Sequence, residues 1–267
     1  MMTTSRVLAL ALACASSLSI ARAQNAAPRL DLDGYKLVFS DDFDKLDISR
    51  NGGNGTWAAH TPWNGDFGDA RFADPAPRGP FSVDKGILSI TARKVGDHWD
   101  SGLISSVGEG GKLFAARYGY FEMRAKLPAG KGLWPAFWLN ASQPKNSKEP
   151  GIEVDILEHY GHFPDSYQAL VHIWPKPTQG VPFWKEVVQV PAGSLYSDFH
   201  TYGADVEPDF ITVYLDRKEV WRTRTPPEHH SDLMILANLA MGSGWPIDET
   251  PDPSVMQIDY IRVYQRK

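Results

Sequence analysis

The chain has 267 residues, a formal net charge of −5 at pH 7 and one cysteine, Cys14. An acidic balance without a basic run argues against a nucleic-acid partner, and a single cysteine excludes an intramolecular disulfide. A chain of this length can bury a core large enough to fold as one domain without such cross-links.

Residues 1–23 are typical of a secretory signal peptide. Arg6 forms a short basic region, a mostly apolar segment follows, and residues 21–23 (Ala-Arg-Ala) have the small-x-small pattern of a cleavage site. The apolar segment is shorter than a membrane span, and no later stretch is a candidate. A lipoprotein signal with Cys14 as the acylated residue is an alternative that fits the local pattern poorly. We therefore expect one mature domain over residues 24–267, secreted or periplasmic, without membrane attachment after cleavage.

The mature chain shows little helical periodicity, and strand-like runs recur instead. In residues 121–127 every second residue is apolar, which indicates a strand with one solvent-facing side. Turn-forming residues separate the runs, as at 84–86 and 215–217. About ten strands joined by turns predict an all-β fold, a two-sheet antiparallel β-sandwich. The predicted strands cover residues 36–40, 87–93, 118–127, 134–140, 152–159, 169–174, 186–190, 210–215, 234–239 and 257–264.

Aromatic residues make up 12% of the chain and include nine tryptophans, many of them near Gly and Pro. Such a surplus in a secreted chain indicates a surface on which flat ligands stack. For any single tryptophan, packing in the core is the alternative.

Three acids, Glu153, Asp155 and Glu158, interrupt an otherwise apolar strand-like run. On a regular strand Glu158 would point away from the other two, into a face of aliphatic side chains, at a high desolvation cost. One extra residue at Ile156 and Leu157, a β-bulge, returns Glu158 to the face of the other acids and turns both aliphatic residues to the core. The sequence therefore predicts a bulged strand with three carboxyls on one face.

Carboxylates held this close repel one another. At ~5 Å and an effective dielectric constant of ~20, the repulsion is roughly 3 kcal/mol, or about two pKa units. One acid then keeps its proton near neutral pH while another stays ionised, which is the division of roles that glycoside hydrolysis needs. Two other interpretations stay open from these residues alone: a solvated strand face and a cation-binding cluster.

Four segments resemble glycoside hydrolase family 16, in the order in which that family has them. Residues 153–158 are similar to its ExDxxE signature in the bulged form, and residues 132–139 to its Trp-Pro-Ala-x-Trp strand. Residues 118–124 resemble its YGxFExR strand, and residues 258–264 its closing strand. The matches extend over nearly the whole mature chain. The resemblance implies a concanavalin-like jelly roll in which the acids line a concave substrate cleft.

The resemblance also implies roles for the three acids. Glu153 would be the nucleophile, Glu158 the general acid/base, and Asp155 a residue that tunes both by hydrogen bonding and charge. The implied reaction is retaining and needs no cofactor: a glycosyl-enzyme forms on Glu153, and water then hydrolyses it. We expect a monomeric endo-β-glycanase acting on a polysaccharide, either a β-1,3/1,4-glucan or a glucan-type exopolysaccharide. A non-catalytic carbohydrate-binding jelly roll and a transglycosylase using the same site are the alternatives.

Several aromatic and polar residues are candidates for sugar contact. Trp134 and Trp138 lie four residues apart, so a strand would present both on one face, where they could stack on sugar rings. His172 resembles a histidine that the family places beside the acid/base; a structural histidine is the alternative. The remaining candidates, placed by analogy with the family, are Trp63, Asn64, Arg71 and Trp245.

Many members of the family carry a structural calcium ion away from the cleft. The matching positions here are Asp42, the carbonyl of Gly86, and Asp259. Oxygen ligands suit Ca²⁺, and the ion would stabilise the fold without taking part in the chemistry. The alternative is that Asp259 caps backbone groups without a metal.

Overall fold

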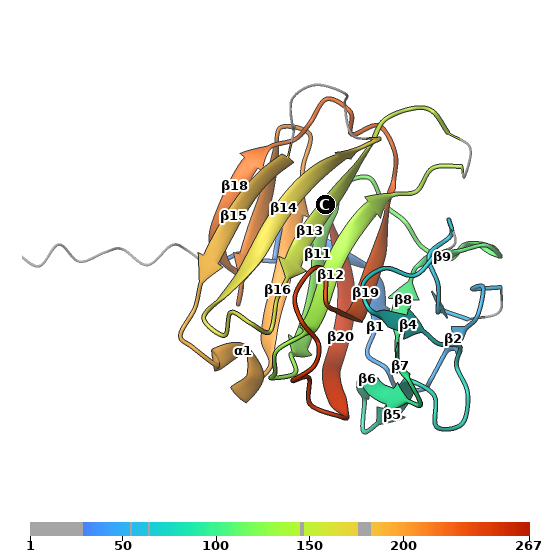
Figure 1. The fold of residues 1–267 in the computed structure, drawn as a ribbon. Helices are drawn as coiled ribbons and strands as arrows, with labels where there is room; N and C mark the ends of the chain where they lie inside the picture. The colour runs from blue at the N-terminus through green and yellow to red at the C-terminus, as the bar shows by residue number, and fades with distance from the viewer. Residues whose placement is uncertain (1–28, 54, 64, 145–146, 176–182) are drawn as a thin grey trace, which may run out of the picture.

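The computed structural model describes residues 29–53, 55–63, 65–144, 147–175 and 183–267, and these form two β-sheets packed face to face (Figure 1). The predicted signal peptide and Asn64 lie outside the described residues. The described part contains a single short helix, α1 (Ser194–Ser197). The predicted two-sheet β-sandwich is confirmed.

The first sheet has ten strands and contains both the first and the last strand of the chain. Its strands run in the order β18-β17-β16-β11-β20-β6-β7-β4, with β1 paired to β20 and β5 to β6. They are β1 (Tyr35–Asp41), β4 (Ala70–Phe72), β5 (Phe81–Asp84), β6 (Ile87–Val95), β7 (His98–Ser101), β11 (Gly119–Lys126), β16 (His200–Val206), β17 (Phe210–Leu215), β18 (Lys218–Arg224) and β20 (Ser254–Arg266).

The second sheet has eight strands in the order β15-β14-β13-β12-β19-β8-β3-β2 and carries the three acids on β13. They are β2 (Ile48–Ser49), β3 (Trp57–Ala58), β8 (Leu103–Ser105), β12 (Leu133–Ala141), β13 (Gly151–Glu158), β14 (Ser166–Trp174), β15 (Phe183–Gln189) and β19 (Leu233–Met241). A separate hairpin joins β9 (Val107–Gly108) to β10 (Gly111–Lys112).

Every predicted strand is present, and the structure adds several that the pattern did not indicate, among them β16 and β18. Pairing is antiparallel except for two short parallel pairs, β2 with β3 and β4 with β7. The predicted turn at 215–217 joins β17 to β18, with Asp216 and Arg217 both at positive φ, 51° and 61°. Two successive left-handed residues give the backbone twist that a tight hairpin needs.

The core lies between the two sheets. The first sheet contributes residues such as Phe121 and Ile261, the second contributes Phe137 and Val154, and all four are fully buried. Burial of each such side chain contributes about 1.5–3 kcal/mol, so alternate residues of β12 and β13 are committed to this interface. The other face of these strands is left for polar and aromatic side chains. Within the described ranges, no helix has the length and apolar character needed to cross a bilayer.

Candidate active site

The β-bulge in β13 is present where the sequence predicts it. Ile156 and Leu157 together lie opposite one residue of β14, Ala169, and the pairing with β12 shifts register at the same place. Both side chains are fully buried in the core between the sheets. The extra residue therefore brings the acids before and after it onto the opposite face.

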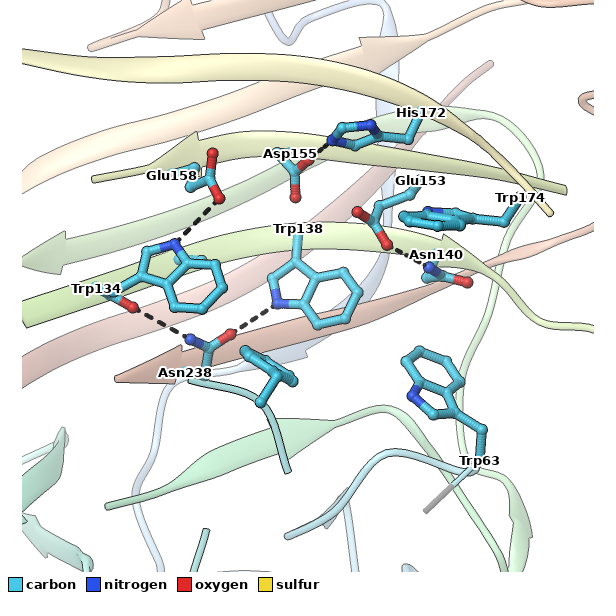
Figure 2. Close-up of a pocket in the computed structure, with 12 residues that line it drawn as sticks. Trp63, Trp134, Trp138, Asn140, Glu153, Asp155, Glu158, His172, Trp174 and Asn238 are labelled. Atoms are coloured by element: carbon cyan, nitrogen blue, oxygen red, sulfur yellow. Dashed lines mark hydrogen bonds and ion pairs between the residues drawn. The ribbon is translucent and has the colours of Figure 1, made fainter. Parts of the chain in front are cut away.

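Glu153, Asp155 and Glu158 line one cavity on that face, and Figure 2 shows their carboxyls in a row along β13. Through the bulge, Glu153 and Glu158 pair with β12 residues only four positions apart, a backbone separation of ~13 Å. The cavity measures about 420 Å³. Its lining consists of Trp63, Phe67, Trp134, Ala136, Trp138, Asn140, Glu153, Asp155, Glu158, His172, Trp174 and Asn238.

The Glu158 carboxyl accepts two hydrogen bonds on a single oxygen. Trp134 Nε1 donates to Glu158 Oε1 at 3.1 Å, and the Tyr160 hydroxyl donates to the same atom at 2.9 Å. Burial raises the pKa of Glu158, while the two donors and the charge of Lys185 oppose that rise. Because Oε1 accepts both hydrogen bonds, Oε2 is the oxygen left to carry a proton when the carboxyl is protonated.

Asp155 is the most deeply buried of the three acids. Burial raises its pKa well above the usual range, and the neighbouring charges of Glu153 and Glu158 add to the rise. His172 Nε2 lies 3.4 Å from Asp155 Oδ2. Glu153, at the other end of the row from Glu158, accepts a hydrogen bond from Asn140 Nδ2 at 2.8 Å. The three carboxyls thus have unlike surroundings, as their proposed roles require.

Aromatic rings form one wall of the cavity. The Trp134 ring stacks on Tyr160 at 5.9 Å between centroids and 11° between planes. A hydrogen bond fixes the orientation of Trp138, because its Nε1 donates to Asn238 Oδ1 at 2.8 Å. The centroid of the Trp63 ring lies 6.2 Å from that of Trp138. Such rigid, flat faces suit stacking against pyranose rings.

A model of the glycosyl hydrolases family 16 matches residues 78–262, which include the bulged strand and most of the described fold. The chain belongs to this family. The bulge, the row of acids and the tryptophan wall are therefore features of a family 16 domain.

Two curated relatives come from Rhizobium meliloti (strain 1021). The endo-1,3-1,4-beta-glycanase ExsH is 35% identical over 262 residues, covering 88% of this chain and 53% of its own length. The endo-1,3-1,4-beta-glycanase EglC is 31% identical with the same coverage. The catalytic domain of an endo-1,3-beta-glucanase (laminarinase) from Thermotoga petrophila RKU-1 superposes with a TM-score of 0.71 at 26% identity, over 87% of this chain and 98% of that one. The chain spans about half the length of the curated relatives.

The cavity of this family 16 domain includes most of the residues predicted for sugar contact, but not all. Trp63, Trp134, Trp138 and His172 line it. Arg71 lines a different cavity, where it pairs with Asp100 Oδ1 at 2.8 Å.

Trp245 is 40% exposed and packs against His162 and Phe163, outside the set that lines the cavity. Sugar contact by Trp245 therefore stays a prediction that rests on the analogy with the family.

Several site residues of the family 16 domain were missed by sequence analysis, although some carry a signal. Asn140 lies two positions after Trp138 and so shares its strand face. Tyr160 likewise lies two positions after Glu158, and Asn238 is the one polar residue in the apolar strand β19. Trp174 lies two positions after His172 on β14 and so shares its strand face, whereas Phe67 has no such signal.

The residues predicted to hold calcium do not fit a calcium site as the structure arranges them. The Arg262 guanidinium donates to Asp42 Oδ1 at 2.6 and 3.1 Å, and Asp259 pairs with Arg124. Two arginine cations neutralise both carboxylates and would repel a divalent ion. Gly86 lies beside the Asp42 carbonyl, but one carbonyl cannot replace the lost charge. Structural calcium stays a prediction that metal analysis of the purified protein would test.

Substitution of Asp155 by Asn should change how stability depends on pH. A raised pKa in the folded state means that the native protein keeps this proton where the unfolded chain has lost it. The free energy of unfolding therefore falls as pH rises above the unfolded value of ~3.9. The Asn variant lacks this titration, so its melting temperature should decline less steeply between pH 4 and 8. If the melting temperatures of variant and wild type declined equally steeply with pH, the raised pKa of Asp155 would be contradicted.

Proposed function

We propose that the chain is an exported endo-β-glucanase that cleaves internal β-1,3 or β-1,4 bonds with retention of configuration. The observation that carries this proposal is the row of three unlike carboxyls in an aromatic-walled cavity. The printed activities of the relatives, endo-1,3-1,4-beta-glycanase and endo-1,3-beta-glucanase, support a β-glucan as the substrate. Export is supported by the leader-like residues 1–23.

In the first step Glu158 is the acid. Its raised pKa favours the protonated carboxyl, and the donors on Oε1 leave Oε2 to deliver that proton to the leaving oxygen. Glu153, oriented by Asn140, attacks the anomeric carbon from the opposite side. The bond to the leaving sugar breaks as the glycosyl ester on Glu153 forms.

In the second step Glu158, now ionised, takes a proton from water. The water oxygen attacks the anomeric carbon, the ester bond to Glu153 breaks, and the sugar leaves with its original configuration. Burial and the neighbouring charges of Glu153 and Glu158 raise the pKa of Asp155 and so favour its protonated form. A neutral Asp155 avoids a third negative charge beside Glu153 and can act as a hydrogen-bond donor within the row.

A polysaccharide panel tests the proposal. Laminarin, lichenan, agar, carrageenan and acidic exopolysaccharides are incubated with the full chain, and new reducing ends and product sizes are followed. We expect internal cleavage of a β-glucan. The newly formed reducing end should have the β configuration when its anomeric signal is recorded by NMR directly after cleavage. An α product would exclude the retaining mechanism. Binding of a glucan without cleavage would favour a non-catalytic carbohydrate-binding jelly roll.

Substitution of Tyr160 by Phe should shift the pH profile on the alkaline side. The hydroxyl stabilises ionised Glu158 by donating to it, so its removal raises the pKa of Glu158 further. A general acid with a higher pKa stays protonated to higher pH. The alkaline limb of the kcat/KM profile should therefore move to higher pH. The stacked ring is kept in the variant, which separates this effect from lost packing. An unchanged alkaline limb would show that Tyr160 does not act on the acid.

A further inference from the structure

Three side chains of metal-binding type meet at one end of the row of acids. Glu153, Asp155 and His172 each offer one ligand atom, and these atoms all lie within 4.8 Å of one another. Glu153 and His172 are direct partners across the β13–β14 pair, so the sheet itself fixes their proximity. Figure 2 shows the imidazole and the two carboxyls at the same part of the cavity.

The spacing suits a small transition-metal ion. Zinc holds nitrogen and oxygen ligands at about 2.0–2.2 Å in tetrahedral geometry, which places neighbouring ligand atoms ~3.4 Å apart. His172 Nε2 and Asp155 Oδ2 already lie 3.4 Å apart. The longer Glu153 side chain can close the remaining gap by rotation about its own bonds.

The ligand types favour zinc or copper over calcium. One imidazole nitrogen and two carboxylate oxygens match the preferences of Zn²⁺ and Cu²⁺, whereas Ca²⁺ needs six to eight oxygen ligands. Asn140 already orients Glu153 through the 2.8 Å hydrogen bond to Oε2, and hydrogen bonds of this kind hold the ligands of metal sites in position. The cavity of about 420 Å³ leaves space for a water molecule on the fourth position.

We propose that this cavity binds one Zn²⁺ or Cu²⁺ ion through Glu153, Asp155 and His172, and that the ion excludes the polysaccharide. A metal-bound Glu153 carboxylate has its attacking oxygen engaged, so the ion acts as a reversible competitive inhibitor. Metal binding itself does not depend on hydrolysis. Only the inhibitory consequence rests on the proposed function.

Calorimetry with Zn²⁺ tests the site on the full chain carrying Glu158→Gln, in which turnover is blocked and all three ligands remain. We expect one ion per chain. Adding His172→Gln should weaken binding at least ~10-fold, comparable to the loss of a metal-site residue. The matched control is His98→Gln, which removes an exposed histidine that contacts both Asp97 and Asp100. Loss of binding in the control, or full binding without His172, would overturn the proposal.

Two further measurements separate this proposal from folding defects and from the proposed function. Cu²⁺ bound to the protein should show electron-spin coupling to one imidazole nitrogen, and this coupling should disappear with His172→Gln while the circular dichroism spectrum is retained. A glucan oligosaccharide that binds the cleft should raise the apparent Kd for Zn²⁺, and Zn²⁺ binding unaffected by it would place the ion elsewhere. If no polysaccharide is cleaved but the ion binds as expected, the metal site stands and the enzymatic proposal falls.

Discussion

Replacement of Glu153 by Ala should reduce the rate of β-glucan cleavage at least ~10³-fold, the loss expected when a nucleophile is removed. Glu153 lies in the cavity beside Asp155 and His172, and no other described carboxyl is positioned to take its place at that end of the row. Initial rates of reducing-end formation measure the effect. Glu219→Ala, which removes an exposed carboxyl on β18 of the other sheet, is the control and should leave the rate within ~2-fold.

The stereochemistry of rescue identifies the role of Glu153. An alanine leaves a space in which azide can attack the anomeric carbon of an aryl β-glucan oligosaccharide from the face that Glu153 occupied. One displacement gives an α-glycosyl azide, which NMR distinguishes from the β form. A β-glycosyl azide, or turnover close to that of the wild type, would remove Glu153 from the role of nucleophile.

Replacement of Glu158 by Ala should give a different pattern of loss. Cleavage of the natural polymer should fall by ~10²–10⁴-fold, the usual contribution of a general acid/base. Cleavage of an aryl glycoside with a good leaving group should fall much less in the first step, because that leaving group needs no proton. Rapid-quench measurement of the released phenol should then show a burst, since water attack on the ester has lost its base.

Azide should again restore turnover of the Glu158 variant, but with the opposite product. Azide needs no base to attack the glycosyl ester on Glu153, and two successive displacements give a β-glycosyl azide. The two variants therefore report opposite configurations from the same reagent. The same configuration from both would mean that the two glutamates are not divided between attack and protonation.

The central part of the site could be predicted because its sequence does not fit the alternation of buried and exposed residues on a regular strand. A regular strand would bury Glu158 among aliphatic side chains, and only a bulge at Ile156 and Leu157 resolves this conflict. The structure has the bulge at that position. His172 shows no such conflict, and only the resemblance to the family singles it out on β14, the strand that follows β13 along the chain.

Other elements could not be predicted because their stabilising partners are distant in the sequence. The strand β16 contains a buried acid, Asp205, which satisfies its charge with Tyr35 and Arg266 from the first and last strands. The residues near Asp205 in the sequence give no sign of those partners. The segment of β16 therefore does not have the pattern of a strand. Arg71, on the short strand β4, illustrates the same limit: its pairing with Asp100 depends on the parallel contact between β4 and β7.

The extra residue in β13 makes the chemistry depend on strand length and not only on composition. Exchange of Ile156 for another aliphatic residue changes packing by a methyl group or less and should be tolerated. Removal of Ile156 or Leu157 would take out the bulge and leave the three acids at alternating positions of a regular strand, still on one face. Removal of Val154 would instead turn Glu153 to the face opposite Asp155 and Glu158. In a library of random variants, active clones should therefore contain aliphatic substitutions at Ile156 and tolerate a single-residue gap at the bulge, but they should contain no gap at Val154.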